Sequence, residues 1–451
     1  MAVEQNAGAT ADESVLPHQE AGEKAAAKSG SFANHDFVRL WAGESVSLIG
    51  TQVTRFTMPL VAVLTLNASV TEVGVLNALQ FVPVLTLSLL VGVWLDRRRR
   101  RPVLIACALG NAVLIGMVPV AAATGMLSMG LLYLVVTLTG LLSLAFDVGA
   151  LSYMPDLVGR DLLADANGKM QASTAFAGVA GPGLAGVLIG LITAPVTLTV
   201  DSVSYLFSAL GLIFISKPEP APEVPEVRPP VWQSIAEGLR AVWGNRLLSM
   251  LLVQSAAANL FFGGYITVFV VYAVRVLHLS PAELGIVLAA SAVGSFVGAT
   301  TAGRTRNRLG LGRAMLINTV VMSLVLLLLL LVPRHAGIST MIIFVPAQLA
   351  YGWSVGMFNV NSITLRQVVT PRSVLARMNA AYRMVLFGTA PVGMSLGGVL
   401  GGTAGLRPAL VISLVAMASP LLCLFFSPVL RLTEMPAAAQ EPTPAQSAQE
   451  G

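Results

Sequence analysis

Three ionisable side chains lie inside long apolar stretches of this chain, where a charge is unfavourable. Glu44 and Arg55 share one stretch, and Asp147 lies in another. A charged group at the centre of a bilayer costs about 3 kcal/mol even on a lenient scale, so we expect these residues beside water or beside one another. A buried carboxyl group whose pKa approaches neutrality can bind and release a proton. Glu44 and Asp147 are therefore candidate proton carriers.

Each of these residues also has a structural interpretation. Glu44 could stay wet at a membrane boundary, Arg55 could pair with a neighbouring helix, and Asp147 could be a hydrogen-bonding group in helix packing. Glu44 and Arg55 are eleven residues apart, about three helical turns, and are expected to share one helix face. A further acidic residue in an apolar stretch, Asp201, is expected to be structural.

The composition predicts an all-α integral membrane protein. Charged residues make up 11% of the 451 residues, against about 25% in soluble proteins, and the mean hydropathy is +0.78. Twelve apolar segments are long enough to cross a bilayer, which requires about 20 residues each. Short alternating segments typical of a membrane β-barrel are not the pattern here. The predicted spans are 38–66, 72–95, 102–123, 130–153, 166–191, 195–216, 246–273, 282–302, 313–333, 339–363, 374–402 and 407–430.

The net charge of +5 comes from basic residues in the loops, and most of these lie on one side. If the N-terminus is cytoplasmic, the outer loops hold only Arg275, Arg334 and Arg407. The cytoplasmic loops then hold Arg97 to Arg101, Arg160, Lys169, Lys217, Arg228, Arg240, Arg246, Arg304, Arg306, Arg308, Arg313, Arg366, Arg372 and Arg377. This asymmetry predicts a multi-pass protein of the cell (plasma) membrane with both termini in the cytoplasm, and gives no indication of nucleic-acid binding.

The chain repeats itself at an offset of about 211 residues, so six spans form each half. Ser69-x-x-Glu72 matches Ser280-x-x-Glu283, and both are expected to cap a helix. The other matches are Gly92-x-x-x-Asp96-Arg97 with Gly303-x-x-x-Asn307-Arg308, Phe146-Asp147-Val148 with Phe358-Asn359-Val360, and the glycine-rich segments 181–190 and 393–402. The halves have the same membrane orientation, which is the parallel-repeat arrangement of some transporters.

The loop after the second span reads Gly92-Val-Trp-Leu-Asp96-Arg97-Arg98-Arg99-Arg100-Arg101-Pro102. It resembles the cytoplasmic gating loop of the major facilitator superfamily of secondary transporters, although Arg99 replaces the usual glycine. A simpler interpretation is a basic cluster that only fixes topology. The resemblance implies a cytoplasmic gate of Gly92, Asp96, Arg97, Arg100 and Arg101, with Arg372 and Arg377 near span 11 as candidate partners. In the second copy Asn307 replaces Asp96, so a weaker latch is expected there.

A glycine-rich segment in the fifth span, Ala177 to Gly186, resembles the Gly-x-x-x-Gly-Pro-x-x-Gly-Gly motif of exporters and antiporters. Its key positions are Gly181, Pro182 and Gly186. Small residues let helices approach closely, and a proline permits a bend. Ordinary small-residue packing is the alternative. The resemblance favours efflux over uptake.

Further segments are most similar to the drug:proton antiporter branch that contains macrolide-efflux and enterobactin-exporter proteins. They are Phe146-Asp-Val, Leu163-Ala-Asp-Ala-Asn167 and Thr364-Leu-Arg-Gln367 with Pro371. The resemblance implies the major facilitator fold, with two pseudo-symmetric six-helix halves and a cavity lined by spans 1, 4, 7 and 10. The candidate proton and substrate residues are then Glu44, Arg55, Asp147, Asn259 and Asn359. An arginine found in span 4 of many proton-coupled exporters is absent here.

We therefore expect a monomeric transporter, not an enzyme, that exports an amphipathic small molecule such as a drug, a macrolide-like metabolite or a siderophore in exchange for protons. The alternatives are a nutrient importer or facilitator of the same superfamily and a non-transporting membrane sensor. No cofactor, metal or nucleic acid is expected. The expected organisation is a disordered tail (1–36), an N-terminal half (37–216), a cytoplasmic linker with an amphipathic helix (217–245), a C-terminal half (246–432) and a disordered tail (433–451).

Overall fold

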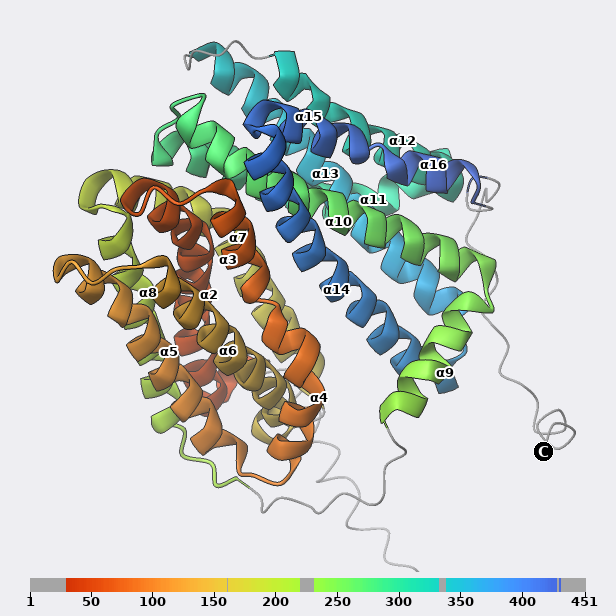
Figure 1. Ribbon diagram of the computed structural model, residues 1–451. Coiled ribbons are helices and arrows are strands. Elements are labelled where there is room, and N and C mark those ends of the chain that lie inside the picture. Colours follow the sequence, from red (N-terminus) through yellow and green to blue (C-terminus); the bar gives the residue numbers. More distant parts are fainter. Residues whose placement is uncertain (1–29, 160, 220–230, 332–337, 428–429, 431–451) are drawn as a thin grey trace, which may run out of the picture.

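The computed structural model describes residues 30–159, 161–219, 231–331, 338–427 and 430 (Figure 1). All regular structure in these ranges is helical. Twelve helices, or pairs of consecutive helical segments, are long and apolar enough to cross a membrane, and each overlaps one of the twelve predicted spans. The predicted all-α class with twelve transmembrane helices is confirmed. Most of both predicted tails lies outside the described residues.

The N-terminal half contains six spans. After a short 3₁₀ turn (η1, Ser31–Ala33), they are α2 (His35–Leu60, continued by the π-helical turn η2, Val61–Thr65), α3 (Val70–Leu79) with α4 (Val82–Asp96), α5 (Arg100–Ala123), α6 (Met129–Val158), α7 (Leu163–Ile192) and α8 (Ala194–Ile213). The second span is divided because Pro83 follows the turn at Gln80 and Phe81 and cannot donate a backbone hydrogen bond to a continuous helix.

The C-terminal half follows a linker helix, α9 (Val231–Trp243). Its spans are α10 (Arg246–Arg275), α11 (Pro281–Leu309), α12 (Leu311–Leu324) with η3 (Val325–Leu331), α13 (Ile338–Val369), α14 (Arg372–Ala404), and α15 (Leu406–Ala416) with α16 (Ser419–Phe425). Pro420 lies in the first turn of the last segment, where the twelfth span is divided. The helix α13 continues six residues beyond the predicted end of span 10, which matters for the site described below.

The two predicted helix caps are confirmed, and both form complete capping boxes. The Ser69 hydroxyl accepts from the backbone N–H of Glu72, whose carboxylate accepts from the backbone N–H of Ser69 at 2.7 Å. Ser280 and Glu283 repeat this arrangement at 2.8 Å. Each box satisfies N–H groups that a helix start would otherwise leave unpaired. We call the end of the bundle with these caps the capped end, and the end with Arg97–Arg101 the arginine end.

The two halves contact each other closely at the capped end. A Cβ atom added to Gly74 of α3 would lie 2.8 Å from the Cα of Gly398 in α14, so a larger residue at Gly74 would collide with the other half. Between the halves, the Thr71 hydroxyl donates to the Gly398 carbonyl at 3.0 Å, and Arg275 donates to the Ala68 carbonyl at 2.7 Å. Toward the arginine end α4 and α14 diverge (Figure 1). The bundle is therefore sealed at one end and spread at the other.

Candidate functional site

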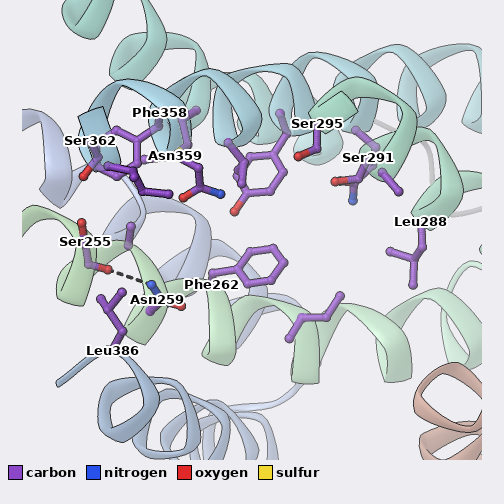
Figure 2. A pocket seen from close by; sticks show the side chains of 18 of the residues that line it. Ser255, Asn259, Phe262, Leu288, Ser291, Ser295, Phe358, Asn359, Ser362 and Leu386 are labelled. Atoms are coloured by element: carbon purple, nitrogen blue, oxygen red, sulfur yellow. Dashed lines mark hydrogen bonds between the residues drawn. The ribbon is translucent and has the colours of Figure 1, made fainter. Parts of the chain in front are cut away.

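A cavity of about 540 Å³ lies within the C-terminal half, between α10, α11, α13 and α14 (Figure 2). Its wall is largely apolar, as in most small-molecule sites. One face of α13 lines it, with residues spaced by three or four positions. Its polar side chains are Ser255, Asn259, Ser291, Ser295, Gln348, Tyr351, Asn359, Ser362, Arg366 and Tyr382.

The two predicted asparagines, Asn259 and Asn359, both line this cavity. Figure 2 shows their amide groups directed into the space between α10 and α13. The Asn259 amide nitrogen donates to the Ser255 carbonyl at 3.0 Å, so its oxygen remains available as an acceptor. Both amides can therefore orient a polar group of a ligand.

Aromatic rings line the part of the cavity nearer the capped end. Phe262 and Tyr351 stack with centroids 5.4 Å apart and planes inclined by 11°. Tyr265 stacks on Phe269 and accepts a hydrogen bond from Gln348 at 2.9 Å. Because stacked and hydrogen-bonded rings lose little freedom on binding, this wall is a fixed surface for an apolar or aromatic group.

The predicted carboxylates form a separate cluster in the N-terminal half. Glu44 is half-buried beside the Ser208 hydroxyl and within electrostatic reach of Asp147. Its Oε2 is buried with no hydrogen-bond partner in the described part of the chain. Asp147 is exposed and interacts electrostatically with Arg55 of α2 and with Arg383 of α14. The structure thus brings Glu44, Asp147 and Arg55 together, and adds Arg383 from the other half.

Asp147 and Arg383 lie at matching depths. Asp147 is eleven residues before the end of α6 at Val158, and Arg383 is eleven residues after the start of α14 at Arg372. At 1.5 Å per residue, each lies about 16 Å from the arginine end of its helix. Asp147 and Arg383 carry opposite charges and lie at the same depth in opposite halves, so they attract each other even when water lies between them.

A small cavity of about 140 Å³ between the halves links the two groups of residues. Arg55 and Phe56 of α2 line it from the N-terminal half. Ile266 and Leu288 line both this cavity and the one in the C-terminal half. The small cavity, which Arg55 lines, and the asparagine-lined cavity therefore share a wall, whereas Glu44 and Asp147 line neither cavity.

Comparison with known proteins identifies the family. The sequence profile of the transmembrane secretion effector family matches residues 26–450. The chain belongs to this family of major facilitator transporters. The multidrug efflux pump Tap of Mycolicibacterium fortuitum is 24% identical over 366 residues, which cover 79% of this chain and 86% of Tap. The enterobactin exporter EntS of Salmonella typhimurium is 27% identical over 260 residues, which cover 56% of this chain and 58% of EntS.

Solved structures support the fold. A bacterial homologue of the iron transporter ferroportin, in an inward-facing state, superposes with a TM-score of 0.66 at 16% identity, covering 86% of this chain and 98% of that chain. The same homologue in an outward-facing state gives 0.56. The predicted major facilitator fold is confirmed. The protein is a multi-pass membrane transporter and not an enzyme.

The gating-loop residues of this major facilitator transporter lie at the arginine end. The Arg100 guanidinium pairs with Asp156 of α6 at 2.5 Å, and Glu219 accepts hydrogen bonds from the backbone N–H groups of Arg100 and Arg101. Arg101 also donates to the carbonyls of Leu212 and Ile213. These contacts stay within the N-terminal half and its adjoining linker.

The proposed partners of the gate are only partly described. Asp96 ends α4, but its side chain and that of Arg372 lie outside the described part of the structure. Arg97 is exposed, and a Cβ atom added to Gly92 would meet nothing within 4 Å. Arg377 forms an ion pair with Glu237 of the linker helix α9. The gate of the sequence analysis therefore stays a prediction in this conformation.

The glycine motif of α7 lies at the contact between the halves. A Cβ atom on Gly186 would overlap the Pro281 carbonyl of α11, and one on Gly285 would lie 2.5 Å from the Pro182 carbonyl. Gly181 faces the other way, against Gln52 of α2. The motif thus positions α7 against both α2 and α11, and part of the seal at the capped end depends on it.

Two arginines near the site were not anticipated as site residues from the sequence. Arg366 was placed in a loop because the apolar stretch ends at residue 363, yet α13 continues to Val369 and Arg366 lines the cavity. Its guanidinium lies 3.9 Å from the ring centre of Tyr382. Arg383 lies deeper in the predicted span 374–402 than Arg377, and that depth was the available signal. Asp201, expected to be structural, is fully buried in α8 beside Gly50 and accepts from the Ser204 hydroxyl at 3.0 Å.

Proposed function

We propose that this transporter exports an amphipathic small molecule across the plasma membrane in exchange for protons, acting as a monomer by alternating access. Relatives named as a multidrug efflux pump and an enterobactin exporter support export. The observation that carries proton coupling is the position of Asp147, an exposed carboxylate that interacts with Arg55 in its own half and Arg383 in the other.

Protonation of Asp147 would remove its attraction to both arginines. Because Arg383 belongs to the opposite half, this attraction favours the conformation in which the arginine end is closed. A proton on Asp147 would favour the open one. Glu44, buried beside Ser208 and near Asp147, is the second candidate carrier. This gives a proton a direct influence on which end of the transporter is open.

The experiment measures uphill transport by purified protein in liposomes with an imposed pH gradient, alongside proton movement reported by a trapped dye. The probes are 2-naphthalenesulfonate and (2-naphthylmethyl)trimethylammonium, two amphipathic ions whose charges do not titrate. We expect gradient-driven accumulation of at least one probe, and its loss in Asp147→Asn or Glu44→Gln. Glu283→Gln, which alters a capping carboxylate away from the cavity, is the matched control. Accumulation by both cavity variants at the parental level would exclude these carboxyl groups as carriers.

We also propose that the arginine end faces the cytoplasm, so that both termini are cytoplasmic and this conformation faces inward. The basis is the concentration of basic residues at that end and the positive-inside rule. A reporter that is active on only one side of the membrane, fused after Gly451, tests this orientation. External activity of that reporter would reverse every assignment of inward and outward given above.

The gating loop would close the cytoplasmic side when the cavity faces outward. A carboxylate at the end of α4 can form charge-assisted hydrogen bonds with basic groups or with the N-terminus of α14. We therefore expect Asp96→Asn to cut transport strongly while the protein inserts at normal levels. Normal transport by inserted Asp96→Asn protein would remove the gating role of this residue.

A further inference from the structure

We propose that the cavity of the C-terminal half binds an aromatic molecule that carries an anionic group, with the anion on Arg366 and the ring toward Phe262. The anionic group is a carboxylate, phenolate, phosphate or sulfonate. This inference rests on the proposed export function, because it names the substrate class. Four observations carry it: the charge balance of the half, the setting of Arg366, the aromatic wall and the spacing between them.

The charge balance leaves Arg366 without an internal counter-ion. Residues 246–432 contain a single acidic residue, Glu283, and its carboxylate is engaged in the capping box at the start of α11. The end of α11 from which Glu283 projects is the one opposite Arg366, which lies in the last turn of α13. No carboxylate in the described part of the chain pairs with Arg366. A guanidinium group that lines a mostly apolar cavity favours an anion brought by the ligand.

The Arg366 guanidinium is positioned for an in-plane anion. Its Cζ lies over the Tyr382 ring, 3.9 Å from the ring centre, and a cation–π contact of this kind does not use up the hydrogen-bonding capacity of the N–H groups. Only the Arg366 Nε has an acceptor in the described part of the chain, the Ser362 carbonyl at 3.4 Å. The remaining N–H groups form the fork that binds carboxylate, phosphate or sulfonate with two parallel hydrogen bonds.

The Tyr382 ring that contacts Arg366 is held in place. Tyr382 is 1% exposed, and its hydroxyl bonds both the Ser255 hydroxyl at 2.6 Å and the Leu251 carbonyl at 3.0 Å. These bonds tie α14 to α10 beneath Arg366. A guanidinium stacked on an immobile ring loses little additional freedom when it binds an anion, and this favours affinity.

The spacing along α10 sets the size of the ligand. Phe262 lies seven residues beyond Ser255, about 10 Å along the helix axis, and Asn259 lies between them. Tyr351 of the facing helix stacks on Phe262, so an aromatic surface stands about two helical turns from the cation. A two-ring aromatic anion spans this distance, and the asparagine amides lie beside its middle.

Binding in the absence of any ion gradient tests the inference. Equilibrium dialysis against nanodiscs with and without the protein gives the affinity for 2-naphthalenesulfonate and for (2-naphthylmethyl)trimethylammonium, which share a ring system and differ in charge. We expect the anion to bind at least tenfold more tightly. Arg366→Gln should lower its affinity about 10- to 100-fold and remove the preference, and Arg366→Lys should retain part of it.

Arg313→Gln is the matched control, because it removes an exposed arginine of α12 that does not line the cavity, and we expect less than a threefold change. A melting temperature for each variant establishes that it is folded, and Phe262→Leu should weaken both probes alike. Equal affinity of the parent protein for the two probes, or an anion preference that survives Arg366→Gln, overturns the inference. The proposed export can fail separately: anion-selective binding without gradient-driven transport overturns only the exporter proposal.

Discussion

The two halves of this transporter have the same fold and opposite chemistry. Within its spans the N-terminal half carries Glu44, Asp147 and Asp201, whereas the repeat offset places Ser255, Asn359 and Ile412 at the matching positions of the C-terminal half. The cavity of about 540 Å³ lies on the C-terminal side, with Arg366 in its wall. The side chains at matched positions are the basis for the division of roles proposed above, in which the N-terminal half handles protons and the C-terminal half holds the ligand.

Moving the carboxylate between the halves gives the largest expected effect. In the double variant Asp147→Asn, Asn359→Asp the acid leaves Arg55 and enters the C-terminal cavity. If the halves are not interchangeable, gradient-driven accumulation should fall at least tenfold in Asp147→Asn and remain low in the double variant. The measurement is probe accumulation in liposomes under an imposed pH gradient.

Asn359→Asp alone serves as the control, since it keeps Asp147 and changes only the charge of the cavity. We expect it to lose accumulation of the anionic probe, because the new carboxylate competes for Arg366, and to retain coupled accumulation of the cationic probe. Restored accumulation in the double variant would mean that either half can carry the proton, and the division of roles drawn above would be wrong.

The sequence predicted the fold better than the site for identifiable reasons. Apolar length alone defines a span, so all twelve were found. The end of an apolar stretch is not the end of a helix, however, because a transmembrane helix can extend past the bilayer with polar residues. Arg366 was missed for that reason. Asp147 was found because it stands alone in a span, but its neighbour Arg383 comes from a distant helix, and only the packing of the halves brings them together.

Where the halves are alike, matched substitutions should behave alike. Gly186 against Pro281 and Gly398 against Val70 are the two copies of the seal at the capped end, related by the repeat offset. Alanine overlaps backbone at Gly186, whereas at Gly398 the nearest backbone atom lies 3.0 Å from the added Cβ. Overpacking costs about 1–3 kcal/mol, so Gly186→Ala should shift the balance toward opening at the capped end by roughly 5- to 150-fold, and Gly398→Ala by less.

Labelling of a single cysteine at Asn77→Cys, beside the small cavity, measures that opening in protein whose Cys107 and Cys423 are replaced by alanine. Gly183→Ala is the control on the same helix, because a Cβ atom there would meet nothing within 4 Å. Faster labelling in Gly183→Ala than in Gly186→Ala would show that contact at the seal does not decide which end opens.

One link at the capped end has no symmetric counterpart. Arg275 donates to the Ala68 carbonyl at 2.7 Å, and the matching residue of the first half is Leu64. A hydrogen bond from a charged donor contributes about 1.5–3 kcal/mol when buried and less where water competes. We therefore expect Arg275→Gln to raise cysteine labelling at Asn77→Cys about three- to tenfold. An unchanged rate would assign the seal to the glycine contacts alone.

The smallest expected effect distinguishes the hydrogen bonds that both capping boxes make from the interaction with Arg275 that Glu72 makes in addition. Glu72 and Glu283 accept the same hydrogen bonds in their capping boxes, but only Glu72 also interacts with Arg275 of the other half.

Glutamine keeps an acceptor and removes the charge, so Glu72→Gln and Glu283→Gln should lose the same helix-dipole interaction, about 0.3–1 kcal/mol. Glu72→Gln should lose a further amount of roughly 0.2–1 kcal/mol, since both partners are partly exposed to solvent. Melting temperatures of the single variants and of their combinations with Arg275→Gln form two double-mutant cycles. Coupling in the Glu72 cycle and none in the Glu283 cycle is the expected pair of results, because the caps are repeated within each half whereas Arg275 joins one half to the other. Equal coupling in both cycles would mean that the charge of Arg275 acts on the whole capped end and not through Glu72.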